Sequence, residues 1–317
     1  MAIGGGKTGR WAALLAGACL VLLSLAAASC TSQPPQGAAS SPVGSAARAP
    51  SRLQGLCFSP YPSGTPAVEP AAGEADRLLG IVAPYTDGIR TFSSTGTASD
   101  PARVAKSKGL YVAAGADVET DPARNDVQVN AAIRLASSGG ADMAVIGEES
   151  IFYNFVSESA LISYLDRAHA AGVKATTSET WGELIGHPKV IAACDVLVAN
   201  MFPYWENIDI KNSISYLQSC YNKTKAAAGG KEVIVETGWP SAGAQHGAAV
   251  ANPQNAAYFL GAFTYWARAH HVKYFYFEAF DEPWKVAHEG EVGGHWGIWD
   301  TSGSPKTGMS ASVGTAP

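Results

Sequence analysis

Short apolar runs alternate with amphipathic stretches along most of the chain, and this alternation is the feature that most restricts its possible folds. The strand-like runs recur at intervals of roughly thirty to forty residues. Alternating strands and helices build parallel sheets, because each helix returns the chain to the start of the next strand. We expect strands at Leu56–Tyr61, Gly88–Phe92, Leu110–Ala114, Met143–Ile146, Val173–Ser178, Asp195–Asn200, Val233–Glu236 and Val272–Glu278.

Helical patterns lie between these strands. Asp100 and Asp121 are each followed by proline, which is typical of a capped helix start. After Lys285 the chain is rich in glycine, and no complete eighth helix is visible. About 265 residues are available and a (β/α)8 barrel needs roughly 250, so residues 52–317 are predicted to form a single TIM barrel. The other expected helices are Ala71–Val82, Ser159–Ala171, Ser213–Ala228 and Asn255–His270.

The first part of the chain has the pattern of an export signal. Lys7 and Arg10 give it a positive start, and Trp11–Ala28 is an apolar run that ends in small residues. The following Ala-Ala-Ser-Cys30 resembles a bacterial lipobox, although leucine is more usual three residues before the cysteine. We expect residues 1–30 to be a signal peptide, with Cys30 lipid-modified or with plain signal-peptidase cleavage nearby. Residues 31–51, rich in Ser, Pro, Ala and Gly, predict a flexible linker.

Charge and cysteine content exclude several classes of partner. The formal net charge is −5 and no basic run occurs, so no nucleic-acid partner is expected. Cys57 falls in a predicted strand, where a buried thiol is usual, whereas Cys194 and Cys220 could pair or stay reduced. No Cys/His spacing resembles a metal site, so we expect neither a metal nor a cofactor. We also expect a monomer that meets the membrane only through its lipid.

Two of the predicted strands end in glutamate. Val233–Gly243 begins as an alternating β-branched run and delivers Glu236 into a Gly-Trp-Pro turn. Met143–Ser150 is a shorter apolar run, broken by glycine, with Glu148 and Glu149 at its end. Such a glutamate can simply cap the next helix, but parallel α/β folds place their ligands at these strand ends. Two carboxylates there are the equipment of a glycosidase, one as acid and the other as nucleophile or base.

The motifs around these glutamates resemble glycoside hydrolase family 17, the β-1,3-glucanases and their transglycosylase relatives. The segment ending Val-Glu-Thr-Gly-Trp-Pro-Ser-Ala-Gly243 is similar to the family's nucleophile motif, and Ile146-Gly-Glu-Glu149 to its acid/base motif. Residues 277–285, Phe-Glu-Ala-Phe-Asp-Glu-Pro-Trp-Lys, are similar to its eighth-strand motif, and the likeness runs from about residue 53 to 306. The resemblance implies Glu236 as nucleophile and Glu149 as acid/base. It also implies retention of configuration, with the carboxyl groups about 5 Å apart.

Aromatic and polar residues recur just after the predicted strands, where a barrel builds its site. As a group the aromatic residues predict a sugar-binding cleft, although any single one could belong to the core or rim. The resemblance further implies that Tyr204 holds the nucleophile, and it adds four polar cleft residues. Arg90 could instead be a barrel-interior charge paired with a strand-end acid. The predicted aromatic residues are Tyr61, Trp181, Tyr204, Trp205, Trp239 and Trp284, and the polar ones are Arg90, Glu278, Asp281 and Lys285.

Glu148 departs from the pattern of the family that the chain resembles. That family has asparagine at this position, and its amide contacts the sugar 2-hydroxyl. A carboxylate accepts a hydrogen bond but loses the amide donor and adds negative charge beside Glu149. The departure implies a shifted pH optimum, a changed substrate or a weaker activity, and the sequence does not choose among them.

The sequence therefore predicts an exported glycosidase, lipid-anchored in the cell envelope or otherwise periplasmic or secreted. It is expected to act on β-1,3-glucan, in endo or exo fashion, by a retaining double displacement with water or another glucan as acceptor. The alternative is a glycan-binding envelope lipoprotein with little or no turnover, which Glu148 makes plausible. A purely structural envelope lipoprotein would leave both strand-end glutamates without a reason.

Overall fold

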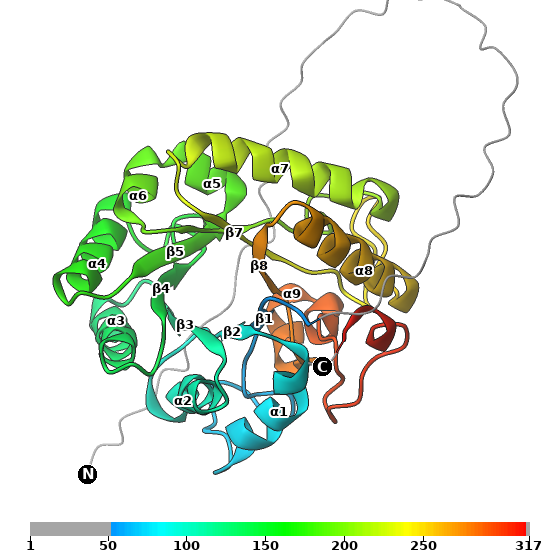
Figure 1. The fold of residues 1–317 in the computed structure, drawn as a ribbon, viewed down its shortest axis with the longest axis horizontal. Coiled ribbons are helices and arrows are strands. Elements are labelled where there is room, and N and C mark those ends of the chain that lie inside the picture. The colour runs from blue at the N-terminus through cyan, green and yellow to red at the C-terminus, as the bar shows by residue number, and fades with distance from the viewer. Residues whose placement is uncertain (1–51, 315–317) are drawn as a thin grey trace, which may run out of the picture. The chain divides into compact units, whose positions relative to one another are not determined.

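The computed structural model describes residues 52–314. The predicted signal peptide, Cys30 and the linker lie outside the described residues. Eight parallel strands close into a barrel in chain order, and helices surround it (Figure 1). The fold is a (β/α)8 TIM barrel, as predicted. The strands are β1 Leu56–Cys57, β2 Gly88–Arg90, β3 Tyr111–Ala116, β4 Met143–Glu148, β5 Ala175–Thr180, β6 Leu197–Asn200, β7 Val233–Thr237 and β8 Lys273–Tyr276.

The helices begin close to the predicted signals. Asp121 caps α3 as predicted, because its side chain accepts from the amides of Ala123 and Arg124. Asp100 was predicted to be a cap, but it is the first residue of α2 and the preceding Ser99 holds the cap position. The α-helices are α1 Glu74–Val82, α2 Asp100–Ser107, α3 Pro122–Ser137, α4 Glu158–Ala170, α5 Trp181–Gly186, α6 Pro188–Ala193, α7 Ser213–Ala227, α8 Pro253–Ala269 and α9 Val286–Glu289. The 3₁₀-helices are η1 Ala83–Tyr85, η2 Gly96–Ser99, η3 Ile210–Asn212, η4 Pro283–Lys285, η5 Glu291–His295 and η6 Ser310–Ser312.

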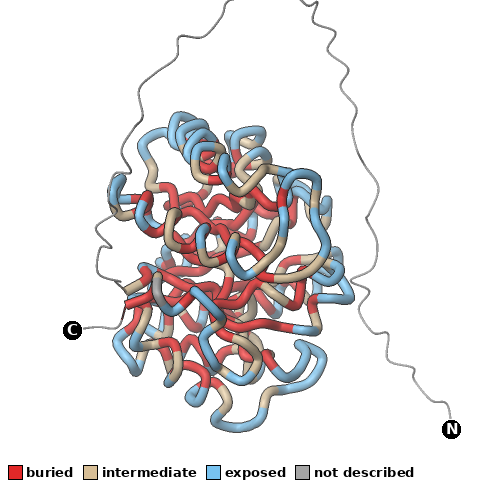
Figure 2. The backbone as a smooth tube through the Cα atoms, turned by 90° about the vertical axis from the view of Figure 1, so that its right-hand side faces the viewer, coloured by how far each residue is buried: buried red, intermediate tan, exposed pale blue. Residues whose placement is uncertain are grey.

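Strand residues alternate between two apolar layers. In β7, Val233 and Val235 pack outward with the helices, whereas Ile234 belongs to a separate inner cluster. Figure 2 shows buried backbone through the centre of the barrel and exposed segments at its periphery. The inner cluster fills the barrel, so polar side chains can gather only beyond it, at the strand ends. Its members are Cys57, Ala113, Met143, Val145, Val196, Val198, Ile234 and Phe275.

The cysteines of the barrel are reduced. Cys57, Cys194 and Cys220 are free and buried, so the disulfide that the sequence left open is not formed. Within residues 52–314, no group of three or more His, Cys, Asp or Glu side chains could hold a metal ion. No helix in the same range is both long and apolar enough to cross a membrane.

Candidate active site

Polar side chains follow the inner apolar cluster along the strands and lie near the C-terminal strand ends. Arg90 of β2 is the register partner of Cys57 and Ala113, which both belong to that cluster. Asn200 of β6 and Glu236 of β7 are register partners of each other, two residues beyond cluster members of their own strands. Arg90, Asn200 and Glu236 are all buried. Buried polar groups need partners, and these three find them in one another and in the glutamates at the end of β4.

Glu236 lies near the end of β7 and is 1% exposed. Its Oε2 lies 3.1 Å from Nη1 of Arg90. Burial raises the pKa of Glu236, while the Arg90 guanidinium and a hydrogen bond from the Cys57 thiol oppose that rise. A carboxylate fixed beside a buried guanidinium has the orientation and the charge that a nucleophile requires.

A bulge at the end of β4 turns Glu148 toward the barrel axis. The register of β4 against β5 shifts between Val145 and Glu148, and Gly147 between them has φ of 88°. A Cβ on Gly147 would meet Thr177 and a leucine of α4, which lie on the outer side of the sheet. The next side chain, Glu148, therefore points inward. Bulges of this kind re-aim side chains next to active sites.

Glu149 has φ of 49°, so the chain turns again directly after Glu148. Nδ2 of Asn200 donates to Oε1 of Glu148 at 2.8 Å and to Oε1 of Glu149 at 2.9 Å. Oδ1 of Asn200 accepts from the Ser178 hydroxyl at 2.8 Å, which fixes the orientation of the amide. Because Asn200 is also the register partner of Glu236, it links the two strand ends that carry the glutamates.

Burial raises the pKa of both Glu149 and Glu236 to about 8, and within residues 52–314 a cation opposes that rise only at Glu236. Burial raises the pKa of Glu149, the charge of Glu148 raises it further, and the Asn200 hydrogen bond opposes the rise. Among the described residues, the ion pairs give a cation to Glu148 and to Glu236 but none to Glu149. The Arg90 guanidinium therefore favours the ionised form of Glu236, and no cation in this part of the chain does so for Glu149. An acid next to an ionised carboxylate is the pair that a retaining glycosidase needs.

Arg90 serves two carboxylates at once. Its Nη2 pairs with Glu148 and its Nη1 lies near Glu236. Its guanidinium carbon also lies 4.4 Å from the centre of the Phe92 ring. Arg90 is thus an interior charge paired with strand-end acids, and those acids are the candidate catalytic group itself.

A second buried charge cluster lies just after β8. Lys285 is 6% exposed, its ammonium pairs with Glu278, and it lies 3.0 Å from Oε2 of Glu282. Asp281 was predicted to belong to the cleft, but its carboxylate pairs with Lys306 at 2.6 Å. Asp281 therefore links the C-terminal segment to the barrel, whereas Glu278 and Glu282, close to it in sequence, pair with Lys285.

The predicted aromatic residues divide by exposure. Trp205 is 38% exposed, and its ring lies 5.1 Å from that of Tyr204. Tyr61 and Trp284 are half-buried. Since stacking on a sugar needs an accessible ring face, Trp205 is the best placed of the predicted residues, followed by Tyr61 and Trp284.

The other three predicted aromatic residues contact other parts of the protein. Trp239 is fully buried, and its indole donates to a backbone carbonyl of the β7–α8 loop. Tyr204 is buried too, and its hydroxyl donates to another carbonyl of that loop rather than to Glu236. Trp181 begins α5, and its ring centre lies 5.2 Å from Nζ of Lys223 on α7. Sequence position gave the strand end but not the direction of each ring.

Two exposed aromatic residues beside Glu149 were not predicted. Phe152 and Tyr153 are each 47% exposed, and their ring centres lie 5.0 Å apart. The pKa of Tyr153 is raised by burial and by the negative charge of Glu149. Their position in the sequence, just after Glu149, could have identified Phe152 and Tyr153 as candidate site residues. Asn200, also missed, could have been found as the polar end of an apolar strand.

The chain matches the BtgE/BtgC glycoside hydrolase domain over residues 55–297. A glucan 1,3-beta-glucosidase of Arthroderma benhamiae is 28% identical over 251 residues, which are 71% of this chain and 80% of that protein. A glucan 1,3-beta-glucosidase of Schizosaccharomyces pombe is 26% identical over 234 residues, 65% of this chain and 71% of that one.

Solved structures agree with the fold. An active-site mutant of Rhizomucor miehei beta-1,3-glucanosyltransferase, in complex with laminaritriose, superimposes with a TM-score of 0.72 at 25% identity. That superposition covers 81% of this chain and 96% of the other. An endo-laminarinase from Formosa, at 17% identity and a TM-score of 0.69, shares the fold. The family match covers most of the barrel, including both strand-end glutamates, and so the chain belongs to the BtgE/BtgC glycoside hydrolase family.

Proposed function

We propose that the chain cleaves β-1,3-glucan by a retaining double displacement and passes the glycosyl group to water or to a second glucan. The observation that carries this proposal is the pair of Glu236 beside Arg90 and Glu149 without a cation, linked through Asn200. The glucan substrate is inferred from the relatives, which are named as glucan 1,3-beta-glucosidases and a beta-1,3-glucanosyltransferase.

In the first step, ionised Glu236 attacks the anomeric carbon while Glu149 protonates the departing glycosidic oxygen. The Arg90 guanidinium favours the ionised form of Glu236 and orients it for the attack. A glycosyl ester forms on Glu236, and the negative charge of that residue disappears. Loss of that charge lowers the pKa of Glu149, whose proton has left with the first sugar.

In the second step, Glu149 acts as a base toward the acceptor. It removes a proton from water or from a sugar hydroxyl, and the acceptor oxygen attacks the anomeric carbon from the face that the leaving group vacated. Two inversions give net retention. Glu236 is released as a carboxylate and Glu149 is again protonated, so the site returns to its starting state.

Exposed rings suit binding of a chain of sugars. Phe152 and Tyr153 lie in the turn that follows Glu149, and Trp205 lies after β6. Each presents an apolar face that can stack on the C–H face of a glucose ring. The buried cluster of Lys285, Glu278 and Glu282 supplies donors and acceptors for hydroxyl groups near the end of β8.

The deciding experiment is incubation of the purified protein with laminarin and short laminari-oligosaccharides. New reducing ends of the β-anomer, seen by proton NMR at early times, support retaining hydrolysis. Products longer than the starting oligosaccharide identify glucan as the acceptor. Unchanged chain lengths and reducing ends, with laminarin still bound, would leave the non-catalytic glycan-binding lipoprotein as the function.

We further propose export and lipid anchoring at Cys30, which rests on the sequence of the leader alone. The protein is then expected in the membrane fraction of its host, and Cys30→Ser is expected to release it or leave the leader uncleaved. A fully soluble native protein whose amino terminus lies beyond Cys30 would contradict the anchor.

A further inference from the structure

The turn that follows β4, Glu149–Phe155, is a compact hydrogen-bonded unit. The Glu149 amide donates to the carbonyl of Ser178 at 2.7 Å, and the Glu149 carbonyl accepts from the Tyr153 amide at 2.9 Å. Phe155 donates to the carbonyl of Ser150 at 2.9 Å. Glu149 starts this turn in a left-handed conformation, with φ of 49°. Its backbone is therefore held only as firmly as the turn is held.

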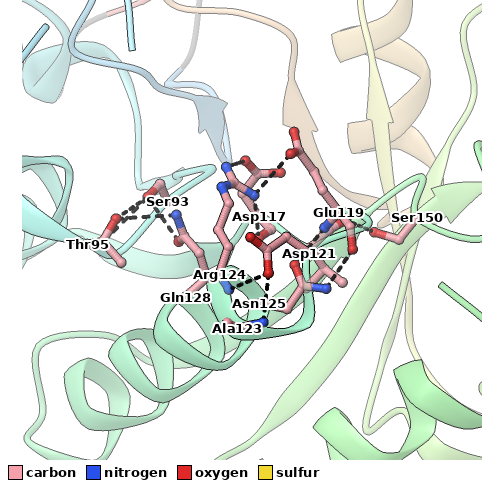
Figure 3. A network of polar contacts seen from close by, with 11 residues as sticks. Ser93, Thr95, Asp117, Glu119, Asp121, Ala123, Arg124, Asn125, Gln128 and Ser150 are labelled. Atoms are coloured by element: carbon pink, nitrogen blue, oxygen red, sulfur yellow. Dashed lines mark hydrogen bonds and ion pairs between the residues drawn. The ribbon is translucent and has the colours of Figure 1, made fainter. Parts of the chain in front are cut away.

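One side of the turn is tied to the β3–α3 loop. The Ser150 hydroxyl donates to the carbonyl of Val118 at 2.8 Å (Figure 3). The loop is itself fixed to α3, because the Asn125 side chain donates to the carbonyl of Glu119 and accepts from its amide. Figure 3 shows this network running from α3 through the loop to Ser150. The first residue after Glu149 is thus anchored.

The other side of the turn rests on Glu179 of β5. Oε1 of Glu179 accepts from the Ile151 amide at 2.9 Å, and Oε2 accepts from the Phe152 amide at 3.4 Å. Glu179 is 1% exposed, and Ala175, four residues earlier on the same strand, packs in the outer core. With the alternation of the strand, Glu179 faces away from the barrel axis and stands behind the turn.

Glu179 is a buried carboxylate without a cation. The ion pairs of residues 52–314 include none with Glu179, so the two backbone amides are what stabilise its charge. Burial raises the pKa of Glu179 to about 7, the two amides oppose the rise, and the charges of Glu148 and Glu183 add to it. A buried charge that is held by two amides and by no cation destabilises the fold.

We propose that Glu179 is a positioning residue for Glu149, one that holds the Glu149–Phe155 turn so that the Glu149 carboxyl meets the glycosidic oxygen. This inference rests on the proposed function, in which Glu149 is the acid. Glu179 touches neither Glu236 nor the inner face of the barrel. It acts through the backbone of Ile151 and Phe152, and through its charge.

The charge gives the proposal a second consequence. Groups that face Glu179 are Glu148 and Glu149 at the end of β4 and Glu183 on α5. The negative charge of Glu179 is one of the causes that raise the pKa of Glu149. Removing the charge therefore lowers the pKa of Glu149 and moves the alkaline limb of the pH–rate profile to lower pH.

The test is Glu179→Gln, assayed on two substrates that differ in their need for an acid. In laminaritetraose the leaving group is a sugar alkoxide, whose oxygen must be protonated as it departs. In a 2,4-dinitrophenyl β-laminaribioside the leaving group is 2,4-dinitrophenolate, which departs without protonation. We expect kcat/KM to fall roughly 10- to 100-fold on laminaritetraose, because a displaced acid loses most of its contribution. On the aryl glycoside we expect a change of less than about threefold, since kcat/KM there reports a step that needs no acid.

The ratio of kcat/KM on laminaritetraose to kcat/KM on the aryl glycoside does not depend on how much of the variant is folded. Any unfolded fraction of Glu179→Gln lowers both constants equally and leaves their ratio unchanged. Glu183→Gln is the matched control, because Glu183 acts on Glu179 only through its charge, and its carboxylate pairs with His187 at 3.2 Å rather than with an amide of the Glu149–Phe155 turn. Its ratio is expected to stay at the wild-type value.

Glu149→Ala separates failure of this inference from failure of the proposed function. If Glu149→Ala loses activity selectively on laminaritetraose and Glu179→Gln does not, the positioning role is overturned and the acid assignment stands. If Glu149→Ala shows no such selectivity, Glu149 is not the acid, and the role proposed for Glu179 is overturned with it.

Discussion

Replacing Glu148 by asparagine should move both limbs of the pH–rate profile to lower pH. The charge of Glu148 raises the pKa of Glu149 and also raises that of Glu236. Without it, Glu149 loses its proton at lower pH, which lowers the alkaline limb, and Glu236 ionises at lower pH, which lowers the acidic limb. Arg90, which now pairs with both Glu148 and Glu236, would serve Glu236 alone.

The size of the shift follows from the geometry. The Oε1 atoms of Glu148 and Glu149 accept from the same nitrogen of Asn200 at 2.8 and 2.9 Å, so their separation cannot exceed the sum of those distances. Two charges about 5 Å apart interact by about 3 kcal/mol at an effective dielectric constant near 20, which is about two pKa units. Arg90 neutralises part of the charge of Glu148, which brings the expected shift to about one unit.

The assay is kcat/KM on a laminari-oligosaccharide across the pH range, for wild type and Glu148→Asn. Glu232→Gln is a suitable control, because the Glu232 carboxylate pairs with Lys273 at the N-terminal ends of β7 and β8, the end of the barrel opposite to the candidate site. Its profile is expected to match wild type. Limbs that stay in place in Glu148→Asn would refute the coupling and show that the Arg90 pair already screens Glu148 completely.

Further predictions concern the two candidate catalytic glutamates and two of the tryptophans. Glu236→Gln should lower kcat by several orders of magnitude with an unchanged circular dichroism spectrum, because the covalent step is lost; near-normal turnover would place the nucleophile elsewhere. Glu149→Ala should be rescued by azide on an activated aryl glycoside and yield the β-glycosyl azide, and the absence of that product would speak against the acid/base role. Trp239→Ala should lower the free energy of unfolding by about 3–5 kcal/mol in denaturant titration. Trp205→Ala should instead raise KM with little loss of stability, and the reverse pattern would exchange their roles.

The barrel could be predicted because its signals are local. Each strand is a short apolar run, and several helix starts, such as those of α3, α4 and α8, carry a side-chain cap, so the periodicity alone gives the βα order. The candidate glutamates could be predicted for a related reason, since Glu149 and Glu236 end apolar strands that break at glycine. Residues at the carboxyl ends of parallel strands share one face of the barrel, and this needs no knowledge of the packing.

The rest depended on directions that the sequence does not carry. Glu148 would face outward in a regular strand and faces inward only because the chain bulges at Gly147. Trp205 is partly exposed while Trp239 is fully buried, although both follow a strand end. Asn200 acquires its role from Glu149, which is distant in sequence and adjacent only in the closed barrel.

The Glu149–Phe155 turn carries the proposed proton donor and two exposed rings on one hydrogen-bonded segment. Tyr153 is joined to Glu149 by a hydrogen bond within the turn, and Glu179 and Val118 hold the turn from either side. A sugar that stacks on these rings would therefore be positioned relative to the Glu149 carboxyl rather than to Glu236. Grafting this turn between related barrels would transplant acceptor preference as a unit, while the nucleophile on β7 and the sugar it holds would remain those of the host.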